Sequence, residues 1–238
     1  PSKKMMTDFC SSYNIPSSKV DIELHGIWKR QKFEEKVNHD THHEGKNDKI
    51  NIRCLGFINP YKGYEYALYA MKIVRENIPE AFLTIAGDFT PNFAQHESKK
   101  YIEKLNEIIR KENLSSNANI VQKYLTEDEF DYYIKTSSII LLPYSRVVAA
   151  SGVLHKAISY KIPIILAGSS TFINEISYFI PIVPAKNIEM LAEKIIRICT
   201  SKEYQEKIKS QYDNYIETHD WNKIVHEVYE DFIIIMSK

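Results

Sequence analysis

The chain has 238 residues, enough for one large or two small domains, and its 44% hydrophobic and 26% charged residues are ordinary for a globular protein. Lysine plus arginine equals aspartate plus glutamate at 31 each, so no overall positive charge favours nucleic acid or an anionic membrane as a partner. The three widely spaced cysteines argue against a disulfide framework and a thiolate metal site, and we expect a reducing, cytoplasmic setting.

The first fifty residues differ in composition from the rest of the chain. Residues 19–28 contain one alternating stretch, Val-Asp-Ile-Glu-Leu, that is typical of a strand, but residues 1–30 are too few to form an independent core. Residues 31–49 are almost without apolar side chains. They include His39, His42 and His43, but imidazoles on a flexible polar segment lack the fixed geometry of a zinc site. We therefore expect residues 31–49 to be a polar linker.

From Ile50 onward, short apolar runs alternate with stretches of helical periodicity. Short runs that are apolar throughout are typical of parallel strands buried on both faces. The stretches between them leave room for the crossover helices that a parallel sheet requires. The sequence therefore predicts an α/β fold with a doubly wound, Rossmann-like parallel sheet, with strands at residues 50–57, 81–86, 119–125, 138–144, 162–167 and 180–184.

Helices are indicated between these strands by apolar residues spaced three or four positions apart. Such stripes occur at residues 67–78, 102–109 and 188–198. Thr126 and Glu129 have the spacing of a capping box, which predicts a helix start directly after the third strand. A last helix, predicted from Trp221 to Met236, carries an apolar stripe that needs a partner surface. That partner could be this domain's own flank, a missing domain or a neighbouring chain.

The loop after the first predicted strand, Gly56 to Gly63, carries one candidate anion-binding group. Ligands of open parallel sheets bind at the carboxyl edge, where this loop lies. Lys62 would project there, and an ammonium beside a helix start can neutralise a phosphate. The ordinary alternative is that Lys62 is a surface lysine at a helix start.

A second candidate follows the buried strand that ends in Leu-Leu-Pro-Tyr. Ser151-Gly152-Val153-Leu154 opens a helix there, and the free amides and positive dipole end of a helix N-terminus favour an anion. In the alternative interpretation, Ser151 merely serves as the helix N-cap.

Taken together and in this order, the two loops resemble the nucleotide-sugar-binding half of the family-4 (group 1) retaining glycosyltransferases of GT-B fold. Gly56 to Gly63 is similar to the family's Gly-x-x-x-x-x-Lys-Gly phosphate loop. Residues 132–144 and Ser151 to Leu154, followed by Ile162-Pro163-Ile164-Ile165 and Asn174-Glu175, look like its signature region. Asp220-Trp221 with Tyr229 resembles the closing helix that in this family crosses back onto the N-terminal domain.

The resemblance covers nearly the whole chain and implies a division into parts. Residues 1–30 would be the end of an N-terminal acceptor domain, and residues 31–49 the linker. Residues 50–217 would form the donor-binding domain, and residues 218–238 the crossover helix. The rest of the acceptor domain, which in this family carries a catalytically important histidine, would be missing from this chain.

The resemblance also implies roles for individual residues. Lys62 and the amides of Ser151, Gly152, Val153 and Leu154 would bind the donor diphosphate. Tyr124 and Leu125 would lie against the base, and Lys156 stands at a ribose-binding position. Glu175 matches a family glutamate near the donor, which makes Lys62 and Glu175 the candidates for a catalytic contribution. Further donor-site loop residues are Gly56, Asn59, Gly63 and Arg146.

The implied reaction is glycosyl transfer, with retained anomeric configuration, from a UDP- or GDP-sugar to a glycan or lipid-linked acceptor. The resemblance implies no cofactor and no protein-bound metal, because backbone dipoles and cationic side chains would stabilise the departing diphosphate. The expected location is the cytoplasm, with peripheral contact at the inner face of the membrane as a further expectation.

The sequence departs from the family pattern in two ways. The family's usual pair of glutamates falls on Val148 and Lys156, and its frequent phosphate-loop arginine falls on Phe57. Lys62 is left as the principal cation, with Arg146 as a substitute on the adjacent loop. A catalytically silent nucleotide-binding or assembly module is therefore the alternative function. A third option, another doubly wound nucleotide- or phosphate-binding enzyme, is disfavoured because the first loop lacks Gly-x-Gly-x-x-Gly and Gly-x-x-x-x-Gly-Lys-Ser/Thr.

Overall fold

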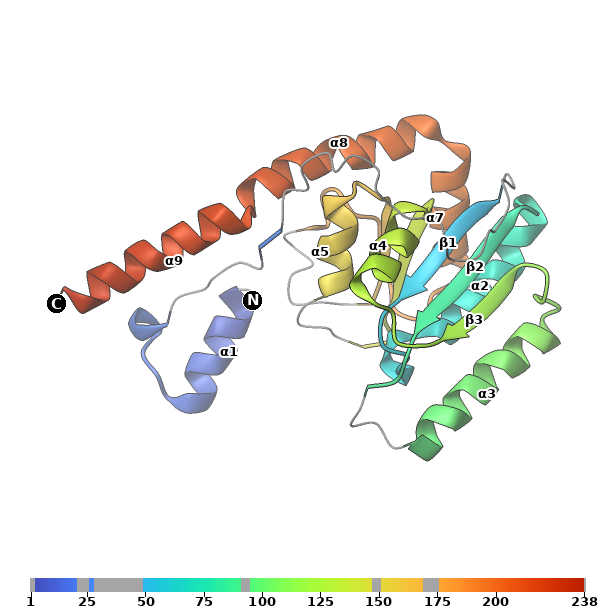
Figure 1. Cartoon of the computed structure of the whole chain (residues 1–238), viewed down its shortest axis with the longest axis horizontal. Helices are drawn as coiled ribbons and strands as arrows, with labels where there is room; N and C mark the ends of the chain where they lie inside the picture. Colours follow the sequence, from blue (N-terminus) through green and yellow to red (C-terminus); the bar gives the residue numbers. More distant parts are fainter. Residues whose placement is uncertain are drawn as a thin grey trace.

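A computed structural model describes residues 3–20, 26–27, 49–90, 95–146, 151–168 and 176–237. Its described strands form one all-parallel sheet in the order β3-β2-β1-β4-β5-β6 (Figure 1). They are β1 (Ile50–Leu55), β2 (Ala81–Gly87), β3 (Ala118–Gln122), β4 (Ile139–Pro143), β5 (Ile164–Ala167) and β6 (Ile182–Val183). The predicted doubly wound α/β fold is confirmed.

The strand order reverses between β1 and β4, which pair through Ile52 with Ile139 and Arg53 with Ile140. Ligands of doubly wound sheets bind at such a reversal, outside the carboxyl ends of the strands. The loops that leave β1 and β4 therefore border the expected crevice. Every residue of β4 is buried, as its unbroken apolar sequence predicted.

The third strand ends earlier than its predicted bound at residue 125, because β3 stops at Gln122. The amide of Lys123 still donates to the carbonyl oxygen of Gly87, and the polypeptide then turns toward a helix. That helix, α4 (Glu127–Lys135), begins with the predicted capping box. Thr126 Oγ1 accepts from the Glu129 amide at 3.3 Å, and Glu129 Oε2 accepts from the Thr126 amide at 3.0 Å.

Helices cover both faces of the sheet (Figure 1). On one face α2 (Tyr64–Asn77) packs against α3 (Gln95–Lys111) and α7 (Ile188–Thr200). On the other face lie α4 and α5 (Gly152–Ser159). The predicted stripes are core, since α2 buries Ala67, Ala70, Met71 and Val74, and α7 buries Leu191, Ile195 and Ile198.

The C-terminal part consists of α8 (Lys202–Thr218), which packs against α5 and α7, and α9 (Trp221–Met236), which extends away from the domain (Figure 1). α9 confirms the predicted last helix, but its apolar stripe has no cover in the described part of the chain. Ile224 is buried, whereas the later apolar side chains are exposed, namely Val225, Val228, Tyr229, Phe232, Ile233, Ile234, Ile235 and Met236.

Residues 26–27 touch the junction of these two helices. Ile27 donates its amide to the His219 carbonyl oxygen at 2.6 Å and accepts from the Trp221 amide at 3.2 Å. Gly26 lies so close to the Trp221 ring that a Cβ there would stand 2.2 Å from it. Further toward the N-terminus, the sequence did not predict helix α1 (Lys3–Tyr13) or the 3₁₀ turn η1 (Ser17–Lys19).

Several sequence predictions lie outside the described residues. These are most of the strand at residues 19–28, most of the linker at residues 31–49 with its histidines, and the positions Val148, Asn174 and Glu175. Of the helices that can be described, none combines the length and apolar character needed to cross a bilayer.

Gly87 supplies a stability test of the close approach between the ends of β1 and β2. It has φ +152°, and a Cβ there would lie 2.1 Å from the Gly56 carbonyl oxygen. Gly87→Ala should therefore lower the free energy of unfolding by about 3 kcal/mol, measured by urea denaturation. Gly152→Ala is the control, because nothing lies within 4 Å of its Cβ position, and its change should stay below about 0.5 kcal/mol. A similar effect of both substitutions would contradict the described packing.

Candidate functional site

The loops that follow β1 and β4 are joined at the carboxyl edge of the sheet. Ser145 donates both its amide and its hydroxyl to the Tyr61 carbonyl oxygen, at 3.0 and 3.1 Å. Gly63 has φ +69° and lies against Pro143, whose carbonyl oxygen would be 2.1 Å from a Cβ at this glycine. The structure thus brings together the two loops that the sequence singled out separately.

The first loop directs Lys62 through a short 3₁₀ turn, η2 (Pro60–Lys62). Asn59 caps this turn, because its Oδ1 accepts from the Tyr61 amide at 3.3 Å. Pro60 suits the first position of the turn, and Gly63 ends it in the left-handed conformation. Asn59 and Gly63 therefore shape the loop, and Lys62 is its charged group. Gly56 faces α5, with its Cβ position 3.5 Å from Val153 Cγ2.

Lys62 reaches the second loop through Tyr144. Its Nζ donates to Tyr144 Oη at 3.4 Å and lies 4.8 Å from the centre of the Tyr144 ring. Tyr144 is buried, and its Oη lies 2.9 Å from Ser151 Oγ. We call Lys62, Tyr144 and Ser151 the Lys62 relay. Sequence reasoning placed Tyr144 only at the end of a strand. Its position could have indicated a role in the site, because an aromatic hydroxyl follows directly after that buried strand.

The Lys62 ammonium is half-buried and forms no ion pair with any residue in the described ranges. Burial lowers the pKa of Lys62 from 10.5 to about 8, and the Cys54 thiol acts weakly in the opposite direction. Burial also raises the pKa of Tyr144 to about 12, so its phenol is neutral near pH 7. A partly desolvated cation beside a neutral hydroxyl is suited to bind an anion.

The N-terminus of α5 supplies backbone donors to the same place. Ser151 is its N-cap, because its Oγ accepts from the Leu154 amide at 3.3 Å. The Leu154 amide is thereby used within the protein, whereas the amides of Gly152 and Val153 have no acceptor among the described residues. Gly152 is exposed with open space before it. Two free amides and the positive end of the helix dipole thus adjoin the Lys62 relay.

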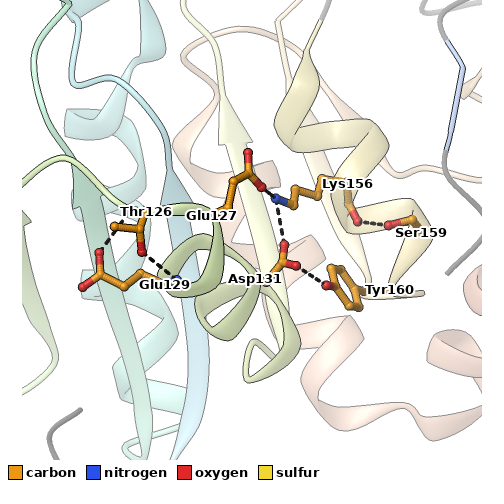
Figure 2. A network of polar contacts seen from close by, with 7 residues as sticks. All are labelled: Thr126, Glu127, Glu129, Asp131, Lys156, Ser159 and Tyr160. Atoms are coloured by element: carbon orange, nitrogen blue, oxygen red, sulfur yellow. Dashed lines mark hydrogen bonds and ion pairs between the residues drawn. The ribbon is translucent and has the colours of Figure 1, made fainter. Parts of the chain in front are cut away.

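Lys156 is held in a polar network between α4 and α5 (Figure 2). Its Nζ forms ion pairs with the Glu127 and Asp131 carboxylates, the second at 2.8 Å, and lies 5.1 Å from the centre of the Phe130 ring. Tyr160 Oη donates to the other Asp131 oxygen at 2.6 Å. The Lys156 and Asp131 side chains are only 19% and 18% exposed, whereas Glu127 is 88% exposed. The network joins the two helices on this face of the sheet.

The remaining candidates lie around this centre. Tyr124 is 70% exposed between β3 and α4, and Leu125 beside it is buried. Tyr61 directly precedes Lys62 in the sequence. The Arg146 guanidinium lies 4.7 Å from the centre of the Tyr61 ring. Arg146 and Lys62 thus both contact Tyr61, from which the Lys62 Nζ is 5.5 Å away. Glu175 is outside the described residues.

Comparison with known proteins agrees with this geometry. The family model described as "Glycosyl transferases group 1" matches residues 35–214. Among solved structures, a glycosyltransferase from Rickettsia africae superposes with a TM-score of 0.69 at 13% identity, covering 99% of this chain and 53% of that one. Anabaena HepE in complex with UDP and glucose gives 0.68 at 12% identity, covering 77% and 48%. A comparison with curated proteins gives no match.

A mutant of TarM from S. aureus, solved with fondaparinux, α-GlcNAc-glycerol and UDP, gives a TM-score of 0.68 at 13% identity, covering 96% of this chain and 42% of that one. The chain therefore spans about half the length of these proteins. At such low identity the superpositions establish the GT-B type of Rossmann-like fold. Because the family model matches most of the sequence, the chain belongs to the group 1 glycosyltransferases.

Proposed function

We propose that this chain binds the diphosphate of a nucleotide-sugar donor for glycosyl transfer. The main supporting observation is the connection of Lys62 through Tyr144 to the N-terminus of α5. Lys62 is half-buried, and its ammonium has no ion pair among the described residues. Family membership supports the reaction class, and HepE and TarM were solved with UDP. A UDP- or GDP-sugar is the donor class that we propose.

The chemistry follows from charge that develops when the sugar leaves. The departing diphosphate gains negative charge, which fixed dipoles and cations stabilise most strongly when they are already in position. In our proposal the Gly152 and Val153 amides, the α5 dipole and Lys62 provide that stabilisation. Arg146 adds a second cation from the adjacent loop. We propose a glycan or lipid-linked molecule as the acceptor and retention of the anomeric configuration.

The second candidate function is a nucleotide-binding or assembly module without turnover. This alternative is favoured by Lys156, which occupies a position where the family usually has a carboxylate. Its ammonium forms ion pairs with two carboxylates of α4. The two functions differ in one measurement, sugar release from UDP-glucose and related donors by the full-length gene product. Turnover supports the transferase, and tight donor binding without turnover supports the module.

Titration calorimetry with UDP and GDP tests donor binding directly. We expect binding of at least one of them, and much weaker binding of the corresponding nucleoside, because the diphosphate carries the charge recognised here. Lys62→Met should weaken diphosphate binding roughly tenfold or more, since charged hydrogen bonds are lost. Lys111→Met is the matched control at the end of α3, on the amino side of the sheet. No binding of either nucleotide at millimolar concentration would refute the proposal.

The pH dependence of this affinity should report on Lys62. Its pKa of about 8 means that the free protein loses this positive charge as the pH rises through about 8. A phosphate group is already doubly charged above about pH 6, so the affinity should fall on the alkaline side because of Lys62. Lys62→Arg should keep its charge and shift this decline to higher pH, and Lys62→Met should remove it. A wild-type affinity that stays constant from pH 7 to 9.5 would contradict the assignment.

Lys156 should contribute mainly to stability. Lys156→Met leaves the Asp131 carboxylate without its ammonium partner, and we expect unfolding to become easier by about 1–2 kcal/mol. Lys194→Met is the control, because Lys194 is equally 19% exposed but, among the residues that the structure describes, pairs only with the exposed Glu193. Both variants are compared by urea denaturation and UDP titration. A large loss of UDP affinity by Lys156→Met at unchanged stability would instead assign Lys156 to the nucleotide.

A further inference from the structure

We propose that Tyr144 is a positioning residue that aims Lys62 and the Ser151 hydroxyl at one shared anion. This inference rests on the proposed function and extends it to a residue that does not itself hold the ligand. The supporting geometry is the Lys62 relay, in which Tyr144 Oη lies 3.4 Å from Lys62 Nζ and 2.9 Å from Ser151 Oγ.

The chemistry of Lys62 fixes the direction of the first hydrogen bond. An ammonium can only donate, so Tyr144 Oη accepts from Lys62. Either hydroxyl can donate in the second bond, and in the relay that we propose the phenol proton is donated to Ser151 Oγ. That oxygen also accepts from the Leu154 amide at 3.3 Å, which fills both of its lone pairs. Ser151 is left with its own proton, for which the described residues supply no acceptor.

In this arrangement the relay and the start of α5 present hydrogen-bond donors. The remaining protons of Lys62, the Ser151 hydroxyl and the Gly152 and Val153 amides are all donors. A diphosphate has acceptor oxygens and no donors when fully ionised, so it matches this set, whereas a hydroxyl or an amide ligand would leave donors unpaired. Hydrogen bonds arranged in one direction also polarise one another, which strengthens the last donor.

Other groups around Lys62 do not replace Tyr144. Tyr61 on η2 contacts the ammonium only through its ring, at 5.5 Å, and the Arg146 guanidinium lies 4.7 Å from the centre of the same ring. Cys54 on β1 is buried, and burial raises the pKa of its thiol well above the usual range. Tyr64 on α2 donates to the Phe57 carbonyl oxygen. Tyr144 is thus the hydroxyl that joins the cation to α5 within the described residues.

The test is Tyr144→Phe, which keeps the ring beside Lys62 and removes the hydroxyl. UDP affinity, uridine affinity and thermal stability are measured on the purified protein, with GDP and guanosine used if GDP is the nucleotide that binds. We expect UDP binding to weaken roughly tenfold, with less than a twofold change for uridine. The alkaline decline in UDP affinity should begin at lower pH, because the charged form of Lys62 loses a hydrogen-bond acceptor.

Tyr212→Phe is the matched control. Tyr212 is equally buried, on α8, and its hydroxyl forms no hydrogen bond with any group of the Lys62 relay. It should change neither the UDP affinity nor its pH dependence. Ser151→Ala should weaken UDP binding as Tyr144→Phe does, whereas Ser151→Thr, which retains the hydroxyl, should restore most of it. This pair keeps the inference testable if Tyr144→Phe fails to fold.

A double-mutant cycle separates positioning from mere packing. When Lys62 is already methionine, Tyr144→Phe should weaken UDP binding threefold or less, because no ammonium remains to be aimed. Equal losses in both backgrounds would overturn the inference, as would wild-type UDP affinity in Tyr144→Phe. Failure of the wild-type protein to bind any nucleoside diphosphate would instead refute the proposed function, and the inference with it.

Discussion

The contact between Gly63 and the backbone of Pro143 sets the spacing on which the candidate site depends. Only a residue without a Cβ allows the loop after β1 to rest on the end of β4, and the two Ser145 hydrogen bonds to Tyr61 hold it there. This spacing brings Lys62 within reach of Tyr144, and Tyr144 within reach of Ser151. The geometry proposed to bind an anion is therefore a property of two strands that meet where the sheet order reverses.

Lys62 is held in a place that is unfavourable for its charge in the absence of a ligand. Partial burial disfavours the ammonium, and the rings of Tyr61 and Tyr144 and one hydroxyl offset this only in part. Lys156, between α4 and α5, shows the opposite arrangement, since two carboxylates surround it. The contrast separates the cation that we propose binds an external anion from one that is already paired within the protein.

The sequence predicted the parts of the structure that depend on local pattern. The unbroken apolar runs indicated the parallel strands, and Thr126 with Glu129 indicated the start of α4. The family resemblance selected Lys62 and the Ser151 junction. The roles of Tyr144 and Lys156 depend on partners far away in the sequence, and no periodicity contains that information. The end of β3 was also misplaced, because the buried, apolar Leu125 belongs to the otherwise exposed turn before α4 and not to the sheet.

The pairing of β1 with β4 also bears on how the site forms. β1 lies between β2, which follows it closely along the chain, and β4, which comes only after two further helices. Closing such a long loop costs entropy before its contacts repay it, so non-local parallel pairing is a slow step in folding. We therefore expect β1 and β2 to associate early and the β1–β4 edge late. The crevice would then be among the last features to appear as a newly made chain folds.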